Sequence, residues 1–190
     1  MKNLLQFIKL LFGNKKTQIT HTIEQPKEEK VEKKYPISKK ELEKVSDPIE
    51  PEYQSAYEEF YEKINDFRNE CGLSMTPTSY FRSKARQIRI YKEKAKKKQF
   101  PFEDGVYNES KVPLKSKHMT GYACDFADAD KKLAHWVFDN LDWCKENGFY
   151  FENFGININT GKWDSKYDKT PTWLHIQIVP PKSGRTVFNP

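Results

Sequence analysis

Apolar residues recur along the chain at spacings that predict three helices. The first begins near Tyr53 and ends at Gly72, and its buried positions are Tyr53, Tyr57, Phe60, Ile64 and Phe67. A second is predicted to begin after Thr78 or Ser79, with a buried face formed by Phe81, Ala85, Ile88, Tyr91 and Ala95. A third runs from about Ala129 to Asn147, where the Asn-Gly pair at 147–148 is a typical end signal.

Three other segments, 122–126, 156–159 and 173–178, alternate apolar and polar residues as strands do. Each offers one apolar face to a core and carries Asp125, Asn157 or His175 on the other face. The pattern predicts an α+β fold with helices packed on one side of a small antiparallel sheet. The polar side chains would then gather on the uncovered face.

Residues 1–13 are predicted to form a short amphipathic helix, with an apolar face of Leu4, Leu5, Ile8, Leu11 and Phe12. Such a helix fits a membrane surface or a partner protein, and it fits equally well a helix that packs on its own domain. The apolar run is shorter than the ~20 residues that span a bilayer, and no small-residue cleavage site follows it. The sequence therefore predicts neither a transmembrane helix nor a cleaved signal, and the localisation stays unknown.

Residues 14–50 are rich in lysine and acidic side chains with almost no large apolar groups, which predicts a charged flexible linker. The apolar share of the 190 residues is 36%, below the roughly 45–50% of an average domain, because this first part is so polar. Aromatic residues make up 14% of the chain and nearly all follow position 52. One folded domain over 51–190 is expected.

The formal charge of +6 and the basic run from Arg82 to Lys98 raise the question of a nucleic-acid partner. A solvated helix face explains the run better, because Tyr91 is the one aromatic side chain within it. No specific nucleic acid is expected. The three cysteines contain no CxxC pair, so they indicate reduced thiols rather than a disulfide framework or a zinc–thiolate site.

The segment Ser116–Asp125 carries the chemistry. His118 and Asp125 are seven residues apart with Gly121 between them, and glycine permits the turn that would bring them to one ion. His175 follows in a separate predicted strand. Two imidazoles and one carboxylate form a catalytic zinc set that leaves the fourth position to water. The alternative is that the histidines are ordinary polar residues and that Asp125 is a turn or cap residue.

Residues 53–180 resemble the M15 family of zinc peptidases, which contains D-Ala-D-Ala carboxypeptidases, dipeptidases and bacteriophage endolysins. The resemblance rests on the S-x-H-x-x-G-x-A-x-D run of Ser116–Asp125, the W-x-H of Trp173–His175 and the S-x-x-R-S of Ser79–Ser83. It implies that His118, Asp125 and His175 bind one Zn²⁺ per chain.

The resemblance also implies that Arg82 hydrogen-bonds the substrate or the developing oxyanion, and that Ser116 helps to position the substrate. The alternative for Arg82 is a place on the basic helix face.

The general base departs from the family pattern. Many members carry a glutamate three residues before the last histidine, where this chain has Thr172, and others carry the acid on the preceding strand, where Asn157 would face the site. The carboxylates nearby are Asp168, Asp164 and Glu152, and we predict that Asp168 is the base.

The predicted function is a zinc-dependent peptidase that hydrolyses peptidoglycan stem peptides as a carboxypeptidase or endopeptidase, in the manner of a phage lytic enzyme or virion component. The alternative is a non-catalytic wall-binding or virion structural module that has lost its general base. In that alternative, residues 1–13 attach the module to a membrane or a phage particle.

Overall fold

The computed structural model describes residues 36–189. The expectations for residues 1–13 and for 14–35 lie outside the described residues. Residues 36–50, which were assigned to the linker, already belong to the folded domain. Helix α2 (Lys39–Lys44) begins with a capping box of Ser38 and Glu41, and Ile37 and Leu42 are buried. The folded domain therefore begins before residue 51.

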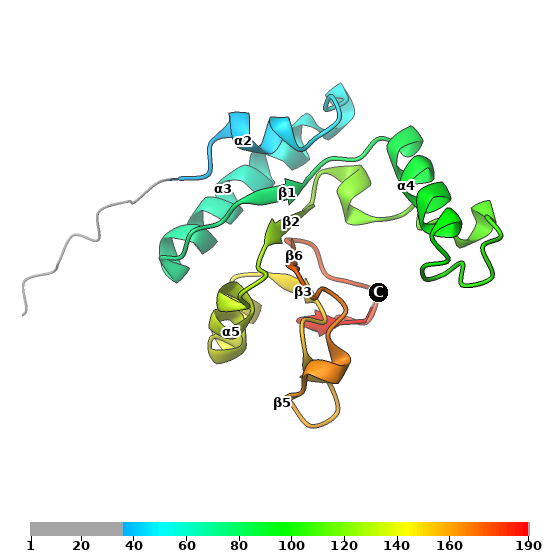
Figure 1. Ribbon diagram of the computed structural model, residues 1–190. Helices are drawn as coiled ribbons and strands as arrows, with labels where there is room; N and C mark the ends of the chain where they lie inside the picture. The colour runs from blue at the N-terminus through cyan, green and yellow to red at the C-terminus, as the bar shows by residue number, and fades with distance from the viewer. Residues whose placement is uncertain (1–35, 190) are drawn as a thin grey trace, which may run out of the picture. The chain divides into compact units, whose positions relative to one another are not determined.

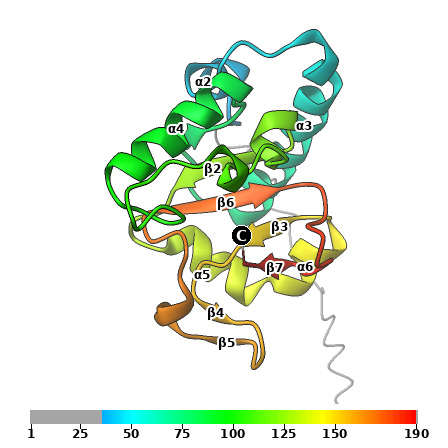
Figure 2. The ribbon, with the colours of Figure 1, turned by 90° about the vertical axis from the view of Figure 1, so that its right-hand side faces the viewer.

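Five strands form the main sheet in the order β1-β2-β6-β3-β7 (Figure 2). Their bounds are Pro77–Ser79, Ala123–Ala127, Trp173–Gln177, Tyr150–Glu152 and Val187–Phe188 in that order. Every neighbouring pair is antiparallel except β3 and β7, which are parallel. The predicted α+β class is confirmed, and β7 makes the sheet mixed.

One face of this sheet is the core of the domain. Cys124 and Phe126 of β2, Leu174 and Ile176 of β6, and Phe151 of β3 point into it, and the residues between them face the other way. Helix α3 (Gln54–Cys71) packs its buried aromatic residues against this face and ends at Gly72, whose φ is 64°. The helix predicted from residue 53 onward is therefore observed, including its end.

The predicted helix over 129–147 is two helices, α5 (Lys132–Asp139) and α6 (Leu141–Glu146) (Figure 2). The break lies at Asn140, whose φ of −124° and ψ of 31° leave the helical region. Its side-chain amide donates to the carbonyl of Trp136, which satisfies an acceptor at the end of α5. Both helices contribute to the core through Leu133, Val137 and Cys144.

Helix α4 (Lys84–Lys96) begins later than predicted because Ser83 caps it by accepting from the Arg86 amide. Phe81 therefore lies before the helix, and it is buried without being part of the helix face. The buried positions of α4 are Gln87 and Ala95, whereas Ala85 is exposed. Ala95 is thus buried as predicted, Ile88 and Tyr91 are half-buried, and Ala85 is the one predicted helical position that lies outside the buried face.

Of the predicted strand 156–159, the first two residues form a strand and the last two form a turn, and the strand does not join the main sheet. β4 (Ile156–Asn157) pairs only with β5 (Lys162–Trp163). The Asn153 side chain accepts hydrogen bonds from the amides of Gly155 and Ile156, and this turn leads the chain out of the main sheet. β3, just before the turn, lies next to β6 in the main sheet.

The short 3-10 helices are η1 (Pro51–Tyr53), η2 (Glu109–Lys111), η3 (Lys117–Thr120) and η4 (Ser165–Tyr167). Within residues 36–189, no helix has the length and apolar character needed to cross a membrane. The three cysteines are free and buried.

Candidate active site

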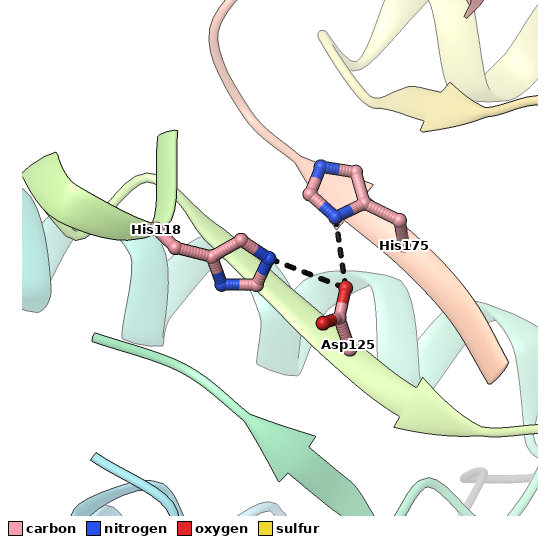
Figure 3. Close-up of side chains that lie close together, drawn as sticks. All are labelled: His118, Asp125 and His175. Atoms are coloured by element: carbon pink, nitrogen blue, oxygen red, sulfur yellow. Dashed lines mark hydrogen bonds and ion pairs between the residues drawn. The ribbon is translucent and has the colours of Figure 1, made fainter. Parts of the chain in front are cut away.

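Three side chains from separate elements converge on one point (Figure 3). η3 carries His118, the middle of β2 carries Asp125, and the middle of β6 carries His175. One ligand atom from each lies within 4.8 Å of the other two. Gly121 ends η3 with a φ of 78°, so the turn expected between His118 and Asp125 is the one that the chain makes.

A single carboxylate oxygen faces both imidazoles (Figure 3). Asp125 and His175 are partners in the β2–β6 register, and His175 Nδ1 lies 2.9 Å from Asp125 Oδ1. His118 Nε2 lies 3.2 Å from the same oxygen. The sheet register and one tight turn are therefore sufficient to assemble the group.

The outer nitrogen of each imidazole has its own acceptor. His118 Nδ1 lies 2.8 Å from the Tyr80 carbonyl, and a carbonyl only accepts, so Nδ1 carries the proton. His175 Nε2 lies 3.3 Å from Gln177 Oε1. The Gln177 amide nitrogen donates to the Val179 carbonyl at 2.6 Å, which leaves its oxygen toward the imidazole. From this hydrogen-bond network, the neutral form of His118 carries its proton on Nδ1 and the neutral form of His175 carries its proton on Nε2.

This donor set fits a zinc ion. In their neutral forms both histidines direct a lone pair at Asp125 Oδ1, so three acceptors meet with no donor between them. A divalent cation resolves that conflict, and two nitrogens with one oxygen leave a fourth tetrahedral position open. The carbonyl and amide behind the rings are the kind of outer partner that orients zinc-bound histidines.

The pKa shifts show how closely the three groups are coupled. Burial by itself would raise the pKa of the Asp125 carboxyl, but His118 and His175 hold it well below its usual range. Burial lowers the pKa of His118 more than Asp125 raises it. Burial also acts to lower the pKa of His175, yet the hydrogen bond and charge of Asp125 raise it above its usual value.

Arg82 binds the second oxygen of Asp125. Its Nη2 donates to Asp125 Oδ2 at 2.6 Å, and its Nε donates to Ser79 Oγ at 2.9 Å. Its backbone amide donates to the His118 carbonyl at 3.0 Å, which ties η3 to the end of β1. Within residues 36–189, Nη1 makes no hydrogen bond, so one donor of the fork stays available. Arg82 thus lies at the site rather than on the exposed face of α4.

The structure places the other predicted residues differently. Ser116 directly precedes η3 and is half-buried. Asp168 pairs with Lys131 Nζ at 2.8 Å through Oδ2, and its Oδ1 accepts from the Thr170 amide at 2.8 Å. Both oxygens of Asp168 thus have structural partners, and Asp168 is not among the three converging residues. Asn157 lies in the β4–β5 pair, outside the sheet that carries the site.

Gln177 and Tyr80 were not identified from the sequence. Gln177 lies two residues after His175 on the same face of β6, so strand alternation was a usable signal. The Tyr80 contact is made by its backbone carbonyl, which every residue has, so the residue type at position 80 could not predict it.

A family model described as VanY: D-alanyl-D-alanine carboxypeptidase matches residues 49–171, more than half of the chain. The chain belongs to this family. The VanY match confirms the resemblance to M15 peptidases and implies a peptidase of the D-Ala-D-Ala carboxypeptidase type. The matched range contains Arg82, His118 and Asp125 and ends before His175, which the fold alone brings to them. No curated protein and no solved structure matches the chain.

Proposed function

We propose that this VanY-family chain is a zinc-dependent peptidase that removes the terminal residue from peptidoglycan stem peptides. The observation that supports it most directly is the convergence of His118, Asp125 and His175, with their ligand atoms within 4.8 Å. A peptidase family together with a catalytic-type zinc set favours hydrolysis of a peptide bond.

In this proposal some residues of the site bind the zinc ion, and others orient the side chains that bind it. His118, Asp125 and His175 hold the zinc, which when bound polarises a carbonyl and lowers the pKa of a water. Gln177 orients the His175 ring, and Arg82 holds the Asp125 oxygen that the histidines do not face. The available Nη1 of Arg82 is the donor that would bind a substrate oxygen. Ser116, beside η3, remains our candidate for positioning the substrate.

Stem peptides that end in D-Ala-D-Ala are the proposed substrate, since the family description names that dipeptide. The net charge of +6 favours encounter with an anionic cell wall. A lytic role in a bacteriophage is the endopeptidase alternative to this proposal, and it predicts cleavage within the stem peptide instead of release of free D-alanine.

Metal content and product analysis test the proposal together. Purified protein is expected to hold one equivalent of zinc and to release D-alanine from a pentapeptide ending in D-Ala-D-Ala, but not from its L-Ala-L-Ala counterpart. His118→Ala should lose both properties. His135→Ala is the matched control, because His135 is exposed and stacks on Trp163 with ring centroids 4.1 Å apart. Protein that binds no zinc after reconstitution would contradict the proposal.

A second candidate function is favoured by one observation. Thr172 stands at the position of the usual glutamate, is exposed, and has a hydroxyl that takes no proton at neutral pH. A chain without a base would bind stem peptides without cutting them. Zinc-loaded protein that co-sediments with purified peptidoglycan and leaves its peptides intact would support this wall-binding module.

A further inference from the structure

The register of the main sheet brings a second carboxylate to the site. β3 pairs with β6 through Tyr150–Gln177 and Phe151–Ile176, so one further step along this antiparallel register sets Glu152 beside His175. Side chains directly opposite each other on neighbouring strands have Cβ atoms about 4.5–5.5 Å apart.

The face that Glu152 occupies follows from the same alternation. Phe151 points into the core, so Glu152 points to the opposite face, as His175 does between Leu174 and Ile176. On the other side of β6, His175 is paired with Asp125. The three polar side chains therefore form one row across β2, β6 and β3.

The position of Glu152 is not explained by any hydrogen bond or ion pair of its carboxylate within residues 36–189. It is half-buried, and its carboxylate makes no hydrogen bond and no ion pair within residues 36–189. By contrast, Asp168 has both oxygens engaged and Asp164 pairs with Lys166 at 2.8 Å. A partly buried carboxylate that has no protein partner and lies in a row with candidate metal ligands is typical of functional sites.

The charged groups around Glu152 come from three neighbouring elements. Burial raises the pKa of the Glu152 carboxyl and Asp125 raises it further, while His175, Lys94 and Arg82 act in the opposite direction. These neighbours place Glu152 among the charged groups of the candidate site, in agreement with the strand register. The Tyr91 ring of α4 also lies near enough to respond to this charge.

We propose that Glu152 is the general base that replaces the missing glutamate at position 172. This inference rests on the peptidase function proposed above. Glu152 takes one proton from the water as the water oxygen bonds to the scissile carbonyl carbon. When the carbon–nitrogen bond breaks, Glu152 returns that proton to the leaving amine, so the carboxylate is regenerated and no co-reactant is needed. The strand that carries the base is β3 instead of the loop before β6.

The test compares Glu152→Gln with wild type at equal zinc loading. Glu152→Gln keeps the size and polarity of the side chain but cannot accept the proton. We expect one equivalent of zinc, unchanged calorimetric affinity for a D-Ala-D-Ala peptide, and a kcat lowered by about 10²–10⁴-fold. The acidic limb of the kcat/KM profile should disappear from the residual activity. Glu152→Asp should recover part of kcat, and Asp164→Asn is the control for loss of a nearby carboxylate.

The outcomes separate this proposal from the proposed function. Active wild type with an equally active Glu152→Gln would overturn the role of Glu152 and leave the peptidase intact. Loss of zinc in Glu152→Gln would make the residue a metal ligand and also overturn it. Loss of turnover in Asp168→Asn but not in Glu152→Gln would assign the base to Asp168. Zinc-loaded wild type that cleaves no stem peptide would overturn both proposals.

Discussion

Asp125 and His175 face each other across β2 and β6, with His175 Nδ1 2.9 Å from Asp125 Oδ1. The strand register sets this pairing, so the two side chains come together whenever β2 and β6 pair. Because Asp125 is the anionic member of the set, it has the largest part in attracting a cation. The sheet register therefore positions two of the three candidate ligands, and η3 supplies the third, His118.

Asp125→Asn should abolish stoichiometric zinc binding while the domain stays folded. The substitution keeps the side-chain shape but removes the negative charge, so affinity should fall by more than the roughly 10–100-fold typical of outer partners. Competition with a chromophoric chelator measures the change. Asp130→Asn is the control, because Asp130 is exposed and pairs only with Lys132 at 2.7 Å. Full zinc binding by Asp125→Asn would contradict the ligand assignment.

Gln177→Leu should weaken zinc binding by about 10–100-fold without unfolding the protein. Leucine fills a similar volume but leaves His175 Nε2 without its acceptor, so the ring loses the contact that orients it. The chelator titration applies here too, with thermal unfolding as the check on folding. Gln54→Leu serves as the comparison, since Gln54 is exposed and contacts Glu58 alone. Equal zinc affinities for the two variants would show that Gln177 has no orienting role.

Arg82→Lys should lower both zinc affinity and kcat, even though the charge is kept. A lysine ammonium cannot bond Ser79 and Asp125 at once through a planar fork as the Arg82 guanidinium does. We expect a loss of about 10-fold in zinc affinity, at the lower end of outer-partner effects. Arg89→Lys, at an exposed position of α4, controls for the exchange itself. A fall in kcat with zinc affinity unchanged would give Arg82 a role toward the substrate alone.

Asp47 should make the stability of the domain dependent on acidic pH. Burial acts to raise the pKa of Asp47, but hydrogen bonds from the Ser83 amide and hydroxyl and the charge of Arg86 lower it below its usual value. A lowered folded-state pKa stabilises the fold above the unfolded value of about 4, and the contribution is lost as pH falls through the folded value.

Asp47→Asn should therefore reduce the free energy of unfolding at pH 7 by roughly 1–2 kcal/mol, because a charged acceptor of the α4 cap is lost. The difference from wild type should shrink below pH about 4. Urea unfolding across this pH range measures it, with Asp66→Asn on the exposed face of α3 as reference. A difference that is constant with pH would rule out the titration of Asp47 as its source.

Local signals carried the predictions that the structure bears out. The apolar spacing before Gly72 needs only helical periodicity and one left-handed residue, and α3 ends there with a φ of 64° at that glycine. His118 and Asp125 were predicted to approach each other because one turn at Gly121 connects them. Motif order then indicated the M15 peptidases, and the VanY match over 49–171 confirms that resemblance.

The predictions and the structure differ where strands pair with segments far away in the sequence. The alternation over 156–159 is compatible with any sheet, and the turn at Asn153 sends it to β5 instead of β6. The same turn gives Tyr150–Glu152 the place beside β6, which puts Glu152 in the row with His175, while Asp168 pairs with Lys131. Residue type does not distinguish Glu152 from Asp168 in the sequence, because both are acids near a predicted loop or strand end.

By itself, the sequence indicated which three residues converge at the candidate site, which family the chain resembles, and where the long helix ends, because each of these depends on spacing within short segments. Only the tertiary structure decided which side chains support them. The second oxygen of Asp125 is held by Arg82, the outer nitrogen of His175 faces Gln177, and Glu152 joins the row across the sheet. These relationships depend on strand order and register, which join residues far apart in the chain.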